Sequence, residues 1–142
     1  MNDKVNLINE VGPGEVFDIS RGISITPIVD HINGVAGGLL NYSADFKTNG
    51  GRCVFDVSAT GWRTGNAGLI ELKVFINGAQ QVVCQAFTNE QASHKALGAR
   101  RFVMPNLPAN NLHTIRLERG NDESRFDEND RIDVILTELI GI

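Results

Sequence analysis

Apolar and polar residues alternate with a period of two along most of the chain, and this pattern constrains the fold more than any other feature. Cys53, Phe55, Val57 and Ala59, for example, would all lie on one side of a strand. Nowhere over about 11 residues do apolar positions recur at i, i+3, i+4 and i+7 without an interrupting Gly or Pro. The sequence therefore predicts strands and no substantial helix.

The strongest local signal is a hairpin. Ile70, Leu72, Val74 and Ile76 alternate with other residues, Asn77-Gly78 follows, and a second alternating run covers residues 81–88. Asn-Gly between two such runs favours a type I′ turn, in which both central residues have positive φ. The expected strands are residues 15–19, 23–29, 39–47, 53–59, 69–76, 81–88, 101–104, 112–119 and 131–140.

Turn residues separate these runs every 8–12 residues, a spacing typical of an antiparallel β-sandwich or jelly roll of about eight strands. Residues 1–14 alternate only weakly and end in Gly12-Pro13-Gly14. We expect them to form an extended N-terminal arm, with terminal disorder as the alternative. The predicted division is an arm over residues 1–14 and a sandwich domain over residues 15–142.

Charge and hydropathy exclude several classes of partner. The net charge of −4 disfavours a nucleic-acid-binding surface. No apolar run approaches the ~20 residues of a membrane span, and the N-terminus lacks the basic start and apolar stretch of a secretion signal. Cys53 and Cys84 fall in alternating segments and are expected to be buried, reduced thiols, with a bridge between neighbouring strands left open.

No residue pattern indicates catalysis, a metal or a cofactor. His31, His94 and His113 lie in no hydrolase or metalloprotease motif, and the histidines and cysteines lack the close spacing of zinc ligands. The acidic stretch at residues 121–130 has ligand types that calcium prefers, but it lacks the glycine of a calcium loop and is interrupted by Phe126. We interpret this stretch as a solvated loop, and the protein as not an enzyme.

Long loops are where a sandwich usually carries its function. The glycine-rich segment 61–68 contains the single tryptophan, Trp62, beside Arg63. Trp62 could cap the sandwich core, anchor a protein interface or stack on a sugar ring. With Asp30 and Tyr42, Trp62 and Arg63 are candidates for a loop contact or a sugar platform.

Four segments, at residues 67–78, 88–97, 106–117 and 129–139, share the layout of one domain type. The third reads His-Thr-Ile-Arg-Leu at residues 113–117. In this layout about half of the chain resembles the trimeric jelly rolls of the tumour-necrosis-factor and complement type, and their relatives in bacteriophage fibres and capsid-decoration proteins. The sequence departs from them at Asn111-Leu112, where such domains commonly have a glycine. The resemblance implies a homotrimer, an exposed or virion-bound location and no enzymatic activity.

These expectations combine into one functional hypothesis and one alternative. The hypothesis is a homotrimeric capsid-decoration (cement) protein of a virion, made in the host cytoplasm, that binds the major capsid protein. Its arm would lie on the coat-protein shell, with Val5, Leu7 and Ile8 as the apolar contacts. The alternative is a lectin-like module of a phage fibre or cell surface that binds a host surface glycan. Neither hypothesis involves a cofactor, a nucleic acid or a membrane.

Overall fold

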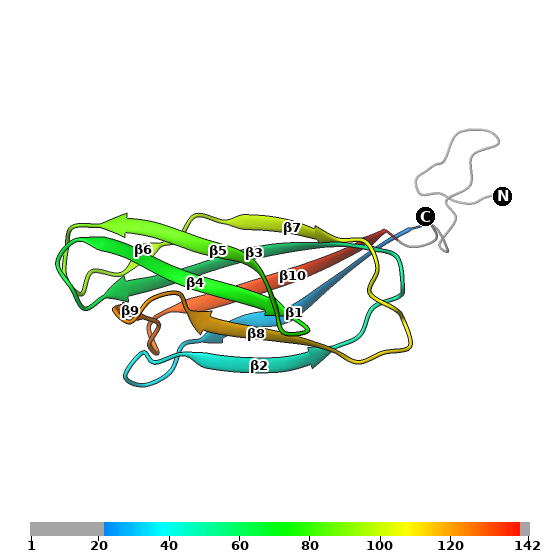
Figure 1. The fold of residues 1–142 in the computed structure, drawn as a ribbon, viewed down its shortest axis with the longest axis horizontal. Helices are drawn as coiled ribbons and strands as arrows, with labels where there is room; N and C mark the ends of the chain where they lie inside the picture. Colours follow the sequence, from blue (N-terminus) through cyan, green and yellow to red (C-terminus); the bar gives the residue numbers. More distant parts are fainter. Residues whose placement is uncertain (1–21, 140–142) are drawn as a thin grey trace.

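The computed structural model describes residues 22–139, which form an antiparallel β-sandwich (Figure 1). The expected arm, including Val5, Leu7 and Ile8, and the expected strand at residues 15–19 lie outside the described residues. The strands are β1 (Ile23–Asn33), β2 (Asn41–Phe46), β3 (Arg52–Arg63), β4 (Gly68–Ile76), β5 (Ala79–Thr88), β6 (Lys95–Ala96), β7 (Arg100–Met104), β8 (His113–Arg119), β9 (Ser124–Arg125) and β10 (Arg131–Leu139). No helix long and apolar enough to cross a membrane occurs in residues 22–139.

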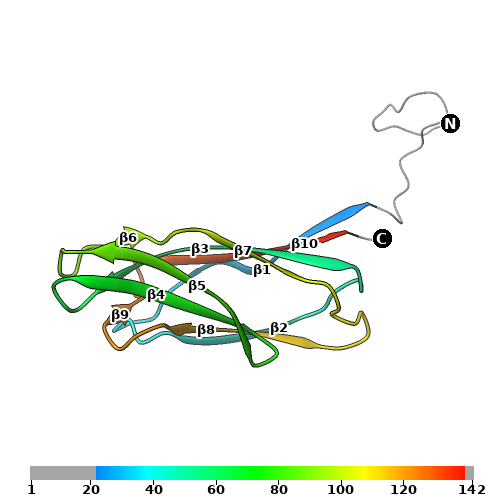
Figure 2. The same ribbon diagram turned by 45° about the horizontal axis from the view of Figure 1, so that its top comes forward.

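The strands form two sheets that lie face to face (Figure 2). One sheet has the order β1-β10-β3, with β7, β6 and β9 pairing along β3, and the other has the order β2-β8-β4-β5. The antiparallel pairs are nested: β4 with β5, β3 with β7, β2 with β8, and β1 with β10. This nesting is the wrapping pattern of a jelly roll, so the predicted fold class is confirmed.

Alternation along each strand places one side of every sheet in the shared core, as the sequence predicts. The rings of Phe55 and Phe102 stack at 4.7 Å between centroids, and Phe46 packs edge-on against Phe55 at 5.9 Å. Cys53 and Cys84 are free and buried in this core. Burial raises the pKa of both thiols to about 11, because the thiolate form would lose its hydration.

The predicted hairpin has the predicted turn. Ile76 pairs with Ala79, which leaves Asn77 and Gly78 as the two loop residues, with φ of 50° and 85°. His113 is buried on the same side of β8 as Ile115 and Leu117. Its Nε2 hydrogen-bonds to the carbonyl of Pro108 at 2.9 Å, so its polar ring is satisfied inside the core.

Two strands extend further than the sequence predicts. β1 runs on to Asn33, so Asp30 lies on a strand and not in a loop. β3 continues through Gly61 to Arg63, so Trp62 and Arg63 are strand residues as well. The glycine does not end β3, because Trp62 and Arg63 find partners in the two-residue strand β9, which periodicity does not reveal.

Candidate binding surfaces

An apolar surface covers one half of the outer side of the β1-β10-β3-β7 sheet. Strand register brings its members together: Ile25 and Val54 both pair with Thr137, and Val54 pairs with Val103. The side chains of Ile23, Ile25 and Val103 are 64%, 67% and 50% exposed. We call this surface the apolar face; it consists of Ile23, Ile25, Pro27, Val54, Val103, Ile135 and Leu139.

The apolar face lies at the end of the sandwich where β1 begins and β10 ends, on the right in Figure 1. Its border is polar. Arg101 forms two hydrogen bonds with Asp56, at 2.8 and 3.4 Å, and this carboxylate raises the pKa of the guanidinium. Thr137 lies within the face between Ile25 and Val54, and Arg52 lies beside Leu139. Exposed apolar side chains bordered by polar groups are a common feature of sites where another protein binds.

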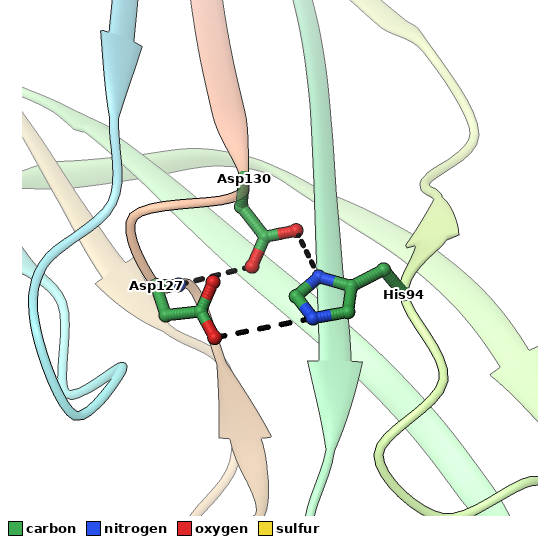
Figure 3. Close-up of side chains that lie close together, drawn as sticks. All are labelled: His94, Asp127 and Asp130. Carbon is green, nitrogen blue, oxygen red and sulfur yellow. Dashed lines mark hydrogen bonds and ion pairs between the residues drawn. The ribbon is translucent and has the colours of Figure 1, made fainter.

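A second cluster joins two loops at the opposite end of β3. His94 precedes β6, Asp127 follows β9, and Asp130 precedes β10 (Figure 3). His94 Nδ1 hydrogen-bonds to Asp130 Oδ1 at 2.7 Å, and His94 Nε2 lies 3.9 Å from Asp127 Oδ2. Asp130 is fully buried, whereas the His94 side chain is 38% exposed.

The cluster contains the right atom types for a metal ion, since one ligand atom from each residue lies within 4.8 Å of the others. The carboxylate oxygens nevertheless already accept hydrogen bonds from the protein. Asp130 Oδ1 also accepts a hydrogen bond from the Thr60 hydroxyl, and Oδ2 accepts one from the backbone N–H of Asp127. Asp127 Oδ2 accepts a hydrogen bond from Trp62 Nε1 at 2.9 Å. A cation would have to displace these donors, so the geometry favours a structural network.

The same geometry limits what His94 can do as a catalyst. A buried aspartate bonded to one ring nitrogen is the orienting half of a catalytic triad, which also requires a nucleophile at the other nitrogen. Here Nε2 of His94 faces a second carboxylate, that of Asp127. The arrangement therefore holds the loops before β6 and between β9 and β10 together.

The four residues proposed as a loop contact or sugar platform lie on three strands. Trp62 and Arg63 are consecutive on β3: Trp62 bonds to Asp127, whereas Arg63 donates to the carbonyl of Leu69 at 2.9 Å. Tyr42 packs against the core from β2, and Asp30 is exposed on β1. Across residues 22–139, no hydrogen bond or ion pair joins any two of these four side chains.

The acidic stretch at residues 121–130 is not the solvated loop that the sequence suggested. Ser124, Phe126 and Asp130 are each fully buried. Phe126 enters the core, and its backbone N–H and carbonyl bond to Gly38 and Val35 of the β1–β2 loop. Phe126, an apolar residue among charged ones, is the sequence signal for this burial. The prediction of a solvated loop treats it only as an interruption of a calcium loop. The sequence gives no signal for the cluster of His94, Asp127 and Asp130, because it forms only where the loop before β6 meets the β9–β10 loop.

Comparisons with known proteins bear on the fold alone. The sequence matches no protein-family model and no curated protein. Dimeric latent PorU from Porphyromonas gingivalis is similar to 81% of this chain at 11% identity and a TM-score of 0.50, and the chain spans 12% of its length.

Two further solved structures show weaker similarity. The CBM36-1 domain of a multidomain xylanase from the hindgut metagenome of Trinervitermes trinervoides matches 85% of this chain and 100% of its own, with 13% identity and a TM-score of 0.42. The T13 IBDV viral particle matches 97% of this chain and 40% of its own, with 11% identity and a TM-score of 0.38. The nested strand order itself makes the described part of the chain an all-β jelly roll.

Proposed function

We propose that this chain is a non-enzymatic structural protein of a virus particle, a capsid-decoration protein that forms a homotrimer and binds the coat-protein shell. The observation that carries the proposal is the apolar face. Burying apolar area provides roughly 25 cal/mol per Å², and a stable interface covers about 800 Å² on each partner. The apolar face and its polar border would together make the contact between copies.

The arm has a separate role in this proposal. The arm over residues 1–14 precedes β1 in the chain, and the first residue of β1, Ile23, belongs to the apolar face. Val5, Leu7 and Ile8 would contact the shell, where an extended segment can add main-chain hydrogen bonds at a sheet edge.

Native mass by light scattering tests the trimer. We expect a species near three times 15.5 kDa that Ile25→Asp converts to monomer. Phe87→Asp is the matched control, because Phe87 is exposed to the same degree, 68% against 67%, but lies on the other sheet. A monomer at every concentration, or equal effects of the two substitutions, would contradict the proposed interface.

Sedimentation with purified empty shells tests the arm. Deleting residues 1–11 should abolish attachment and leave the trimer intact. Attachment that survives this deletion would remove the arm from the proposal. Glycan recognition by Asp30, Tyr42, Trp62 and Arg63 receives no support from their dispersed placement, and we do not propose it.

A further inference from the structure

An open depression of about 410 Å³ lies on the outer side of the second sheet, where β8 ends. Its floor is a row of cross-strand neighbours: Glu118 on β8 pairs with Asn41 on β2 and with Lys73 on β4. The segment with Arg119 and Asp122, which we call the wall, and Leu39 from the β1–β2 loop also line the depression. Its volume is within the range of small-molecule sites.

The backbone around the depression is held in place without a ligand. The carbonyl of Asp122 accepts hydrogen bonds from the guanidinium groups of Arg119 and Arg125, at 2.9 and 2.6 Å. Gly120 donates to the carbonyl of Glu71 at 2.7 Å, and a Cβ at Gly120 would lie 2.4 Å from that of Glu71. Only glycine allows the wall to approach the sheet this closely, so a ligand would meet a preformed site.

The wall and the β1–β2 loop are also fastened to each other. The backbone N–H of Phe126 donates to the carbonyl of Gly38 at 3.0 Å, and the N–H of Val35 donates to the carbonyl of Phe126 at 2.9 Å. Phe126 is fully buried, so it anchors this junction in the core. Leu39 therefore keeps a fixed position beside the polar wall, with 56% of its surface exposed.

The functional groups indicate the class of ligand. The lining contains two cations, Lys73 and Arg119, and two carboxylates, Glu118 and Asp122, so it has no net charge. The carboxylate of Glu118 is paired with Arg116 at 2.6 Å. Within the described part of the chain, the ammonium of Lys73 and the carboxylate of Asp122 have no ion-pair partner. Donors and acceptors side by side suit a neutral ligand that both donates and accepts hydrogen bonds, and Leu39 provides an apolar edge.

We propose that this depression binds a saccharide unit. The hydroxyl groups of a pyranose ring pair with Lys73, Asn41 and Asp122, and its C–H face contacts Leu39. The site lies on the sheet opposite the apolar face, so it stays accessible when other copies cover that face. It does not depend on the virion assignment.

Titration followed by backbone amide NMR shifts tests the proposal, with D-glucose, D-galactose, D-mannose and N-acetyl-D-glucosamine as separate probes. We expect saturable shifts at Gly120, Asn121 and Asp122 with at least one sugar. Lys73→Ala and Asp122→Ala should each weaken binding about tenfold. Lys47→Ala should bind as the parent does, because Lys47 is an exposed lysine at the other end of β2.

Three results would overturn the proposal. The first is that no sugar shifts these amides, or that the shifts centre elsewhere, such as around Trp62. The second is that Lys73→Ala and Asp122→Ala bind as tightly as Lys47→Ala. The third is that glycine or inorganic phosphate saturates the site while every sugar fails, which would assign it to a charged ligand. The trimer is tested separately, by the native mass. The saccharide proposal and the trimer proposal can therefore fail independently of each other.

Discussion

Gly61 and Phe126 occupy adjoining space so closely that a methyl group on Gly61 would lie 2.6 Å from Cε1 of the Phe126 ring. Phe126 is fully buried and cannot turn away without leaving the core. The contact lets β3 pass under the segment between β9 and β10. It also explains a glycine in the interior of a strand, where glycine is otherwise unfavourable.

Gly61→Ala should therefore destabilise the domain by about 1–3 kcal/mol, the usual cost of overpacking a core. Urea unfolding followed by circular dichroism measures the change. Gly98→Ala is the matched control, because a Cβ there meets its nearest neighbour, the carbonyl oxygen of Gln85, at an ordinary 3.4 Å. Equal free energies of unfolding in the two variants would show that the Phe126 ring can move to accommodate the added methyl group.

Asp130→Ala should cost about 2–4 kcal/mol, because it leaves the Thr60 hydroxyl, His94 Nδ1 and the Asp127 backbone N–H without their acceptor. The measurement is again the free energy of unfolding in urea. Asp133→Ala is the control: its partner His31 is exposed, and such surface pairs contribute at most about 1 kcal/mol. Similar losses in both variants would contradict the role assigned to the buried carboxylate.

Trp62 is the single tryptophan, so its fluorescence reports the cluster directly. Asp127→Ala removes the acceptor of its Nε1–H, which must then bond to water. We expect the native emission maximum to shift to longer wavelength. Glu128→Ala, which changes the neighbouring exposed carboxylate, should leave the spectrum unchanged. An unchanged spectrum in Asp127→Ala would mean that this hydrogen bond does not fix the indole.

The raised pKa values of Cys53 and Cys84 predict that the free energy of unfolding falls at high pH. Both thiols have a pKa of about 11 when folded, against 9.0 as the ordinary value. The folded state therefore holds these protons more tightly, and the free energy of unfolding should fall as the pH rises from about 9 to 11. The double variant Cys53→Ala/Cys84→Ala should show a shallower decline over this range. The same slope in both proteins would refute the assignment to the thiols.

Most of the fold was predictable because it rests on local signals. Strand alternation such as that of Cys53, Phe55 and Val57 is set by the requirement that one side of each sheet is buried. The turn at Asn77-Gly78 follows from the backbone angles that these two residue types tolerate. Neither signal requires knowledge of distant parts of the chain.

The candidate sites were much less predictable, because they are made by residues far apart in the sequence. Trp62 meets Asp127, and the apolar face joins Ile25 to Val103 across four strands. Gly61 was interpreted as a turn residue because glycine usually ends a strand; its actual reason, the Phe126 ring, is visible only after folding. The depression beside Lys73 likewise exists only when the β1–β2 and β8–β9 connections meet at one sheet.

The nested pairing has a consequence for the protein during its synthesis. β4 and β5 can pair as soon as both have left the ribosome. β1 cannot pair until β10 has been made, because Ile23 pairs with Leu139, close to the far end of the described chain. Such distant pairing is slow to form. The apolar face requires the same pairing, since Ile25 and Val54 are brought together by Thr137. Nascent chains therefore cannot associate through this face until β10 has been translated.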